Sequence, residues 1–146
     1  MKFLADAMLG RLATWLRLLG YDTAYPRDAT DAELARRARL EQRILLTRDV
    51  ELTRRRGVRA VLIQAEQVED QVRQVFHALN LTAQEAFSRC AECNGLLEEV
   101  SKESVRGRVP PYVFHTQERF RRCPHCARIY WRGTHWARII GQMQDL

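Results

Sequence analysis

The sequence predicts an α/β domain with a mostly parallel sheet, followed by a small zinc ribbon held by four cysteines. In residues 1–86, short apolar runs alternate with segments whose apolar residues recur at helical spacing. This alternation is typical of a three-layer arrangement, in which helices cover both faces of a parallel sheet. After residue 86 the pattern changes to paired cysteines, turn residues and short β-like runs. We therefore divide the chain into residues 1–86 and 87–146.

The first half of the α/β region contains two expected strands and two expected helices. Residues 2–5 form a buried apolar strand, and apolar residues then recur at helical spacing from 8 to 19. Gly20 follows, and its tolerance of positive φ suits a helix end. Residues 21–25 form a second short strand. A capping box, Thr30-Asp31-Ala32-Glu33, predicts a helix over residues 30–41.

The second half repeats the alternation. Residues 43–47 are the next apolar strand, and residues 49–56 are a short helix that stops at Gly57. Residues 58–63 are expected to form a strand, and residues 68–79 a helix with one apolar face. In the ribbon we expect short strands at 96–101, 112–115 and 128–132, with turns at Asn94-Gly95 and Pro110-Pro111.

Composition and charge narrow the class of protein. Of the 146 residues, 46% are hydrophobic and 29% are charged, which is normal for a globular domain. No apolar run approaches the ~20 residues that a membrane span needs, and the N-terminus lacks a signal-peptide pattern, so we expect a cytoplasmic protein without a membrane partner. The net charge is +6, and all basic residues except Lys2 and Lys102 are arginines. Arginine suits phosphate and favours a nucleic-acid partner, although genome composition or thermal adaptation gives the same bias.

Two Cys-x-x-Cys pairs predict a structural zinc site. The four cysteines are Cys90, Cys93, Cys123 and Cys126. In a chain without a secretion signal such pairs indicate metal ligands rather than disulfides, and four thiolates form a closed tetrahedral Zn²⁺ site. The metal would supply much of the folding free energy of so small a segment. Two alternatives are a redox motif at Cys123-Pro-His-Cys126 and a histidine, His115 or His125, in place of one thiolate.

The end of the ribbon combines arginines with aromatic residues, Arg132 and Trp136 among them. Guanidinium groups contact phosphates and aromatic rings stack on bases in single-stranded RNA binding. The alternative is that the aromatic side chains form the small core of the ribbon and leave the arginines as a solvated rim.

Acidic residues follow two of the expected strands. Asp6 and Asp49 each come after an apolar run, and the carboxyl ends of parallel strands share the edge at which ligands bind. Asp31 opens the helix between them, and Glu51 lies two residues beyond Asp49. Clustered carboxylates need a cation, and Mg²⁺ or Mn²⁺ at such a site can activate water for attack on a phosphodiester. Helix capping is the alternative for the three aspartates, and ordinary exposure for Glu51.

Three arginines near the same edge are candidates to hold substrate phosphates: Arg11, Arg17 and Arg48. The alternative for each is an arginine that faces solvent on a helix or loop.

Several segments together resemble the PIN-like RNase family named after the C-terminal domain of the Mut-seven exonuclease. The matching segments are residues 3–13, 15–22, 31–35 and 44–49, and the two cysteine pairs with residues 123–136. The resemblance implies a PIN-like fold with a C-terminal zinc ribbon, and RNA cleavage by acidic residues that coordinate Mg²⁺ or Mn²⁺. Asp6 and Asp49 match acidic positions of the family, Asp31 matches a third, and Glu51 is the candidate for a fourth.

The sequence thus leads to the hypothesis of a metal-dependent endoribonuclease whose zinc ribbon assists RNA binding. Two alternatives stay open: a non-catalytic RNA- or ribosome-binding module, and a protein-interaction adaptor.

Overall fold

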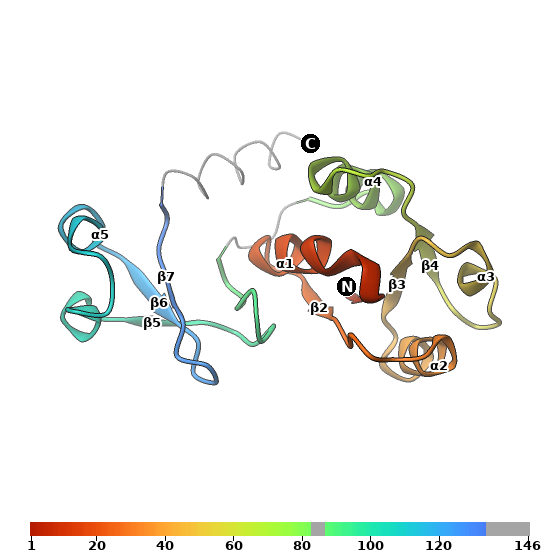
Figure 1. Cartoon of the computed structure of the whole chain (residues 1–146), viewed down its shortest axis with the longest axis horizontal. Helices are drawn as coiled ribbons and strands as arrows, with labels where there is room; N and C mark the ends of the chain where they lie inside the picture. The colour runs from red at the N-terminus through yellow and green to blue at the C-terminus, as the bar shows by residue number, and fades with distance from the viewer. Residues whose placement is uncertain (83–86, 134–146) are drawn as a thin grey trace.

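Two sheets organise the chain. A computed structural model describes residues 1–82 and 87–133 (Figure 1). In the first sheet the strand order is β2-β1-β3-β4 and all neighbours are parallel; the second sheet is antiparallel, with the order β5-β6-β7. In chain order the elements are β1 (Lys2–Ala5), the 3-10 helix η1 (Ala7–Leu9), α1 (Gly10–Leu18), β2 (Asp22–Ala24), α2 (Asp31–Glu41), β3 (Ile44–Thr47), α3 (Val50–Thr53), β4 (Ala60–Leu62), α4 (Val68–Leu79), β5 (Glu98–Val100), the 3-10 helix η2 (Lys102–Val105), α5 (Pro111–Thr116), β6 (Phe120–Arg122) and β7 (Ile129–Tyr130).

Helices cover both faces of the parallel sheet. Successive side chains of a strand point to opposite faces, so Phe3 and Ala5 belong to the apolar cluster that includes α1 and α4. Leu4 belongs to a second cluster, with α2 and α3. Figure 1 shows α1 and α4 on one side of the sheet and α2 on the other. The mixed α/β fold with a mostly parallel sheet is therefore confirmed, and burial on both faces explains why β1 and β3 are continuous apolar runs.

The predictions are accurate for α2 and α4. The side chain of Thr30 accepts a hydrogen bond from the backbone N–H of Glu33 at 3.1 Å, so the predicted capping residue begins α2. Helix α4 has the predicted bounds. The helix expected over residues 8–19 instead begins as η1, and its α-helical part starts at Gly10. The helix expected over residues 49–56 is shorter, because α3 ends at Thr53 and irregular chain leads to Gly57.

The ribbon, defined here as residues 87–133, differs from its prediction in three elements, because η2 and β6 were not expected and α5 replaces an expected strand. The expected strand at residues 112–115 is wrong, since these residues lie in the helix α5. Pro111 stands in the first turn of α5, where a missing N–H costs nothing and a fixed φ favours the helix. Its Val113 packs with Phe120 of β6, and Val105 and Val109 complete this small apolar cluster.

No helix within residues 1–82 and 87–133 is long and apolar enough to cross a membrane. The predicted boundary at residue 86 adjoins residues 83–86, which the structure does not describe, and it stays a prediction.

Candidate metal centre and candidate active site

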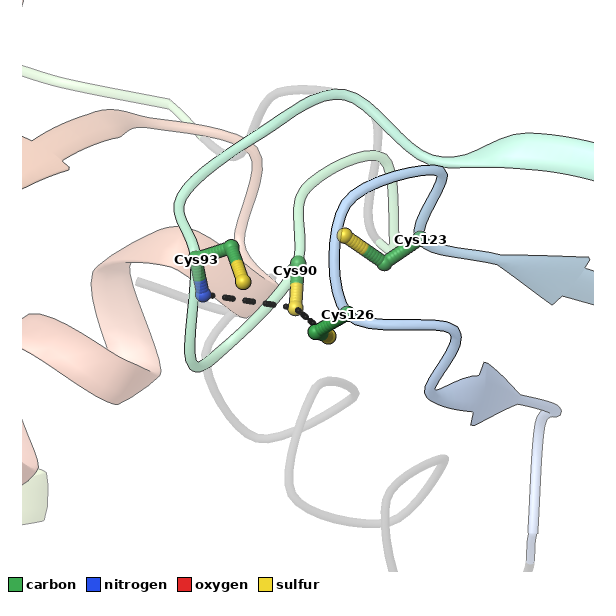
Figure 2. Close-up of side chains that lie close together, drawn as sticks. All are labelled: Cys90, Cys93, Cys123 and Cys126. Atoms are coloured by element: carbon green, nitrogen blue, oxygen red, sulfur yellow. Dashed lines mark hydrogen bonds between the residues drawn. The ribbon is translucent and has the colours of Figure 1, made fainter.

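The four cysteines converge on one point. Cys90 and Cys93 come before β5, and Cys123 and Cys126 lie in the turn between β6 and β7 (Figure 2). All four Sγ atoms lie within 4.8 Å of one another, and those of Cys90 and Cys126 are 3.7 Å apart. Tetrahedral Zn²⁺ with Zn–S bonds of ~2.3 Å requires sulfur atoms about 3.8 Å apart. The four sulfurs therefore fit a structural metal such as zinc.

The two cysteine turns have the same backbone design. In the first turn, the N–H of Asn94 donates to the carbonyl of Cys90 at 2.9 Å, and Asn94 has a φ of 66°. In the second, the N–H of Ala127 donates to the carbonyl of Cys123 at 2.9 Å, and Ala127 has a φ of 64°. Each turn thus ends on a non-glycine residue in the left-handed region.

The pKa values of the clustered thiols also favour a cation between the four sulfurs. Burial acts to raise the pKa of Cys90, but hydrogen bonds from the Tyr130 hydroxyl and from the backbone N–H groups of Cys93 and Glu92 outweigh it and lower the pKa to about 7. Hydrogen bonding to Cys126, followed by desolvation, raises the pKa of Cys93 to about 12. Adjacent sulfurs cannot all ionise without a positive charge between them, and a metal ion supplies that charge.

The redox alternative at Cys123-Pro-His-Cys126 has little support from the local structure. A thioredoxin-like motif opens a helix, whereas this segment is a turn between two strands of the ribbon. Its two cysteines lie together with Cys90 and Cys93, and all four cysteines are free rather than disulfide-bonded.

The first cysteine turn is docked on the α/β region by Arg17. This arginine of α1 is only 8% exposed. Its Nε donates to the carbonyl of Thr23 at 2.8 Å, and its Nη1 donates to the carbonyl of Ala91 at 2.7 Å and to that of Glu92 at 3.3 Å. We expected Arg17 to hold a substrate phosphate, but burial and three carbonyl partners give it a structural role instead.

Asn94 makes the second docking contact, at the edge strand β2. Its Oδ1 accepts from the N–H of Thr23 at 2.9 Å, and its Nδ2 donates to Asp22 Oδ1 at 2.7 Å. Arg43 Nη1 also donates to Asp22 Oδ1, at 2.8 Å. Burial acts to raise the pKa of Asp22, but the hydrogen bonds from Arg43 and Asn94 outweigh it and lower the pKa. Nothing in the Asn94-Gly95 turn signal predicts this contact.

A different group of residues meets at the carboxyl ends of β1 and β3. Thr47 Oγ1 donates to Asp6 Oδ2 at 2.5 Å and accepts from the backbone N–H of Asp49 at 3.0 Å. The backbone N–H of Asp6 donates to the carbonyl of Leu46 at 3.1 Å. Thr47 is fully buried. One hydroxyl therefore links the two aspartates that follow the central strands, as the shared-edge argument predicts.

The same two aspartates are also helix caps. Asp6 Oδ1 accepts from the N–H of Met8 at 3.1 Å, and Asp49 Oδ1 accepts from the N–H of Glu51 at 2.9 Å. Capping, which we weighed as an alternative for both residues, is present together with their position at the sheet edge.

The third and fourth expected acids do not join them in a compact group. Asp31 is exposed in the first turn of α2, which Thr30 caps. The side chain of Glu51 is 83% exposed and lies 3.5 Å from Arg54. In the described part of the chain, the cysteines are the only set of three or more potential metal ligands within 4.8 Å of one another.

The remaining predicted substrate contacts lie in several places. Arg48 Nη1 donates to the carbonyl of Ala65 at 2.6 Å, which holds it beside the end of β4. Arg11 is exposed on α1, and Arg132 is exposed on the ribbon. Trp136 lies outside the described residues.

The comparisons with known proteins identify one family. A family model described as "Mut7-C RNAse domain" matches residues 1–143 of the chain. Comparison with curated proteins and comparison with solved structures gave no match.

Proposed function

Since this match spans nearly its whole length, the chain belongs to the Mut7-C RNAse domain family, and we propose that it is a metal-dependent endoribonuclease with a PIN-like fold. The family description supports a nuclease role with RNA as substrate. In the proposal, Asp6 and Asp49 form the catalytic edge and the ribbon adds affinity for RNA. The cytoplasmic location expected from the sequence stays a prediction.

The pairing of Asp6 and Asp49 through Thr47 is the observation that carries the proposal. The hydroxyl of Thr47 contacts Asp6 Oδ2 at 2.5 Å and the backbone N–H of Asp49 at 3.0 Å, so one buried group binds the carboxylate of the first residue and the backbone of the second.

At this edge, Asp6 and Asp49 offer carboxylate oxygens that suit a hard divalent cation, whereas Asp31 and Glu51 do not join them in a compact group. Carboxylate oxygens, completed by water and substrate phosphate, are the ligands that Mg²⁺ and Mn²⁺ prefer. Such an ion, when bound, would activate water and stabilise the charge of the attacked phosphodiester. Thr47 orients Asp6, and the backbone N–H groups of Met8 and Glu51 fix one oxygen of each aspartate. Arg11 and Arg48 are the proposed phosphate contacts, and Asp31 and Glu51 are proposed further acids.

Zinc has a separate, structural role in this proposal. Four cysteine sulfurs close the coordination sphere and leave no position for water, so the ribbon ion would perform no chemistry.

The test is cleavage of a labelled single-stranded RNA by the full chain with Mg²⁺ or Mn²⁺. We expect Asp6→Asn and Asp49→Asn each to lower the cleavage rate by about a hundredfold or more, because a metal ligand accounts for several kcal/mol of transition-state stabilisation. Asp70→Asn is the matched control: Asp70 lies on the surface of α4, 3.1 Å from Arg73, and its loss should leave the rate unchanged. Full activity in the first two variants would overturn the assignment.

A non-catalytic RNA-binding module is the second candidate. It is favoured by the position of Asp31 and Glu51, which form no compact carboxylate group with the other acids among the described residues. Salt-sensitive RNA binding by the wild-type chain, without cleavage under either ion, would support it. Neither binding nor cleavage would point to a protein-interaction adaptor.

A further inference from the structure

A cavity on the ribbon combines aromatic walls with arginines. Its volume is about 340 Å³, and Phe87, Tyr130 and Trp131 line it together with three arginines and several polar residues. Sites for single small molecules have volumes of ~300–1,000 Å³. Resting on the function proposed above, we propose that this cavity, the ribbon pocket, binds one nucleotide of a single-stranded RNA at a distance from the cleavage site.

The aromatic walls are held in place by the fold. The Tyr130 hydroxyl lies 3.1 Å from Cys90 Sγ and accepts from the backbone N–H of Ala91 at 3.0 Å, so the cysteine centre fixes this ring. Trp131 packs edge-on against the buried ring of Phe120, with ring centroids 6.4 Å apart. Phe87 is 5% exposed and belongs to the core of the α/β region. Rigid rings bind a planar base with a small loss of side-chain entropy.

The arginines give the pocket its affinity for phosphate. Arg121 Nη1 donates to the carbonyl of Phe87 at 2.7 Å, which directs its side chain toward the pocket wall. The guanidinium of Arg132 lies 5.8 Å from the centroid of the Phe87 ring and is exposed to solvent. Arg119 is exposed at the rim. A base stacked on Trp131 would place its phosphate among these side chains.

Two glutamates also line the pocket, and their charges are largely compensated. Glu118 lies 3.1 Å from Lys102, which is not one of the residues that line the pocket. Glu99 lies 3.3 Å from Arg119 and 3.9 Å from Arg121. Three arginines against these two acids leave the pocket cationic. The carboxylate of Glu99 also provides a hydrogen-bond acceptor, which an amino group of a base or a ribose 2′-hydroxyl can use.

The pocket and the carboxylate edge lie at opposite ends of α1. The backbone N–H of Phe87 donates to the carbonyl of Leu18, the last residue of α1, whereas Asp6 comes just before the turn that leads into this helix. Nine helical residues span about 13 Å. Figure 1 shows the ribbon strands β5–β7 on the side of α1 where the helix ends. An RNA that reaches both places must therefore extend over several nucleotides, and the ribbon pocket acts as an anchor rather than as part of the reacting centre.

The experiment measures binding of a labelled single-stranded oligoadenylate to the full zinc-loaded chain carrying Asp6→Asn, which keeps the RNA intact. We expect Trp131→Leu to weaken binding about tenfold, as removal of a base-stacking ring does elsewhere. Tyr112→Leu is the matched control, because Tyr112 is an exposed aromatic residue of α5 outside the pocket. Its affinity should equal that of the parent, and polyphosphate, which has no base, should bind all three proteins equally.

A second variant keeps the test decisive if Trp131→Leu disrupts the fold of the ribbon. Arg132 is exposed, so Arg132→Gln should preserve the fold while weakening RNA binding and lowering the number of counterions released by about one. Arg128→Gln, on the same ribbon but outside the pocket lining, should leave binding unchanged. Unchanged affinity in both pocket variants overturns the pocket. Pocket-dependent binding with no cleavage by the wild-type chain overturns only the nuclease, so the two failures are distinguishable.

Discussion

At the scale of the residue, the hydroxyl of Thr47 organises the proposed active edge. It is fully buried at the end of β3 and serves two partners at once, Asp6 Oδ2 and the backbone N–H of Asp49. The strand pattern alone accounts for a threonine here, since threonine is a common strand residue. Only the tertiary structure shows that its side chain meets the carboxylate of Asp6.

Replacement of Thr47 by valine keeps the shape of the side chain and removes both hydrogen bonds. We expect a loss of about 1–3 kcal/mol of unfolding free energy, because the N–H of Asp49 loses its acceptor, and a higher Mg²⁺ or Mn²⁺ concentration for half-maximal cleavage. Urea unfolding and the metal dependence of the cleavage rate measure the two effects. Thr47→Ser should retain both properties.

Thr23→Val separates positioning from simple stability. Thr23 lies on β2, the strand next to β1, and is also fully buried. Its Oγ1 donates to the carbonyl of Tyr21 at 3.0 Å. Its replacement should lower stability without changing the metal requirement. If Thr47→Val behaves in the same way, Thr47 does not position the acids.

At the scale of the element, the two cysteine turns show how one backbone design acquires two roles. Both turns end on a residue with positive φ, Asn94 in one and Ala127 in the other. Asn94 also covers part of the free edge of β2, through its bonds to the N–H of Thr23 and to Asp22. Asparagine tolerates this conformation better than most residues and brings a polar side chain to the edge.

Glycine substitutions in these turns separate backbone strain from docking. Asn94→Gly keeps a residue suited to positive φ and removes both docking bonds, so we expect stability to fall by about 1–3 kcal/mol. Ala127→Gly, at the matching position of the second turn, relieves the same strain and should be neutral or slightly stabilising. Thermal unfolding of the zinc-loaded chains measures both. Equal effects in the two variants would contradict a docking role for Asn94.

The helix α5, at a position where the sequence predicted a strand, shows tertiary contacts overriding local propensity. Tyr112-Val113-Phe114 is a run of β-favouring residues, and sequence alone favours a strand. Pro111 in the first turn and the packing of Val113 against Phe120 decide in favour of a helix. Propensity is a weak guide when a short segment gains its stability from tertiary contacts.

At the scale of the whole molecule, the ribbon contacts the α/β region through both hydrogen bonds and apolar packing. Arg17 and Asn94 provide the polar contacts, and Phe87, Ala91 and Tyr130 pack on the apolar cluster of α1 and α4. The cysteine centre therefore supports contacts that reach β2, the edge strand of the parallel sheet.

Removal of zinc should weaken the parallel sheet as well as the ribbon. After treatment with a chelator we expect a lower melting temperature and faster amide hydrogen exchange in the peptides that contain β1 and β2, with recovery when Zn²⁺ is restored. Release should become easier as the pH falls below about 7, because the pKa of Cys90 lies at about 7 and protons then compete for this sulfur too. Exchange that changes only in the ribbon would contradict the coupling.

The sequence by itself determined the alternation of strands and helices, the two apolar faces of the sheet and the four sulfur ligands. These features depend on local periodicity and spacing, which are present in the order of residues. It also placed Asp6 and Asp49 at one edge, because parallel strands end together.

Only the tertiary structure decided which polar groups meet. Arg17 has the charge of a phosphate contact, yet it is buried against carbonyls of the first cysteine turn. Asp31 and Glu51 have the composition of metal ligands, yet each lies exposed in the first turn of a helix. Thr47, Asn94 and Tyr130 acquired their partners from segments distant in sequence. Such contacts depend on the angle and distance at which whole elements pack, and no local pattern encodes these quantities.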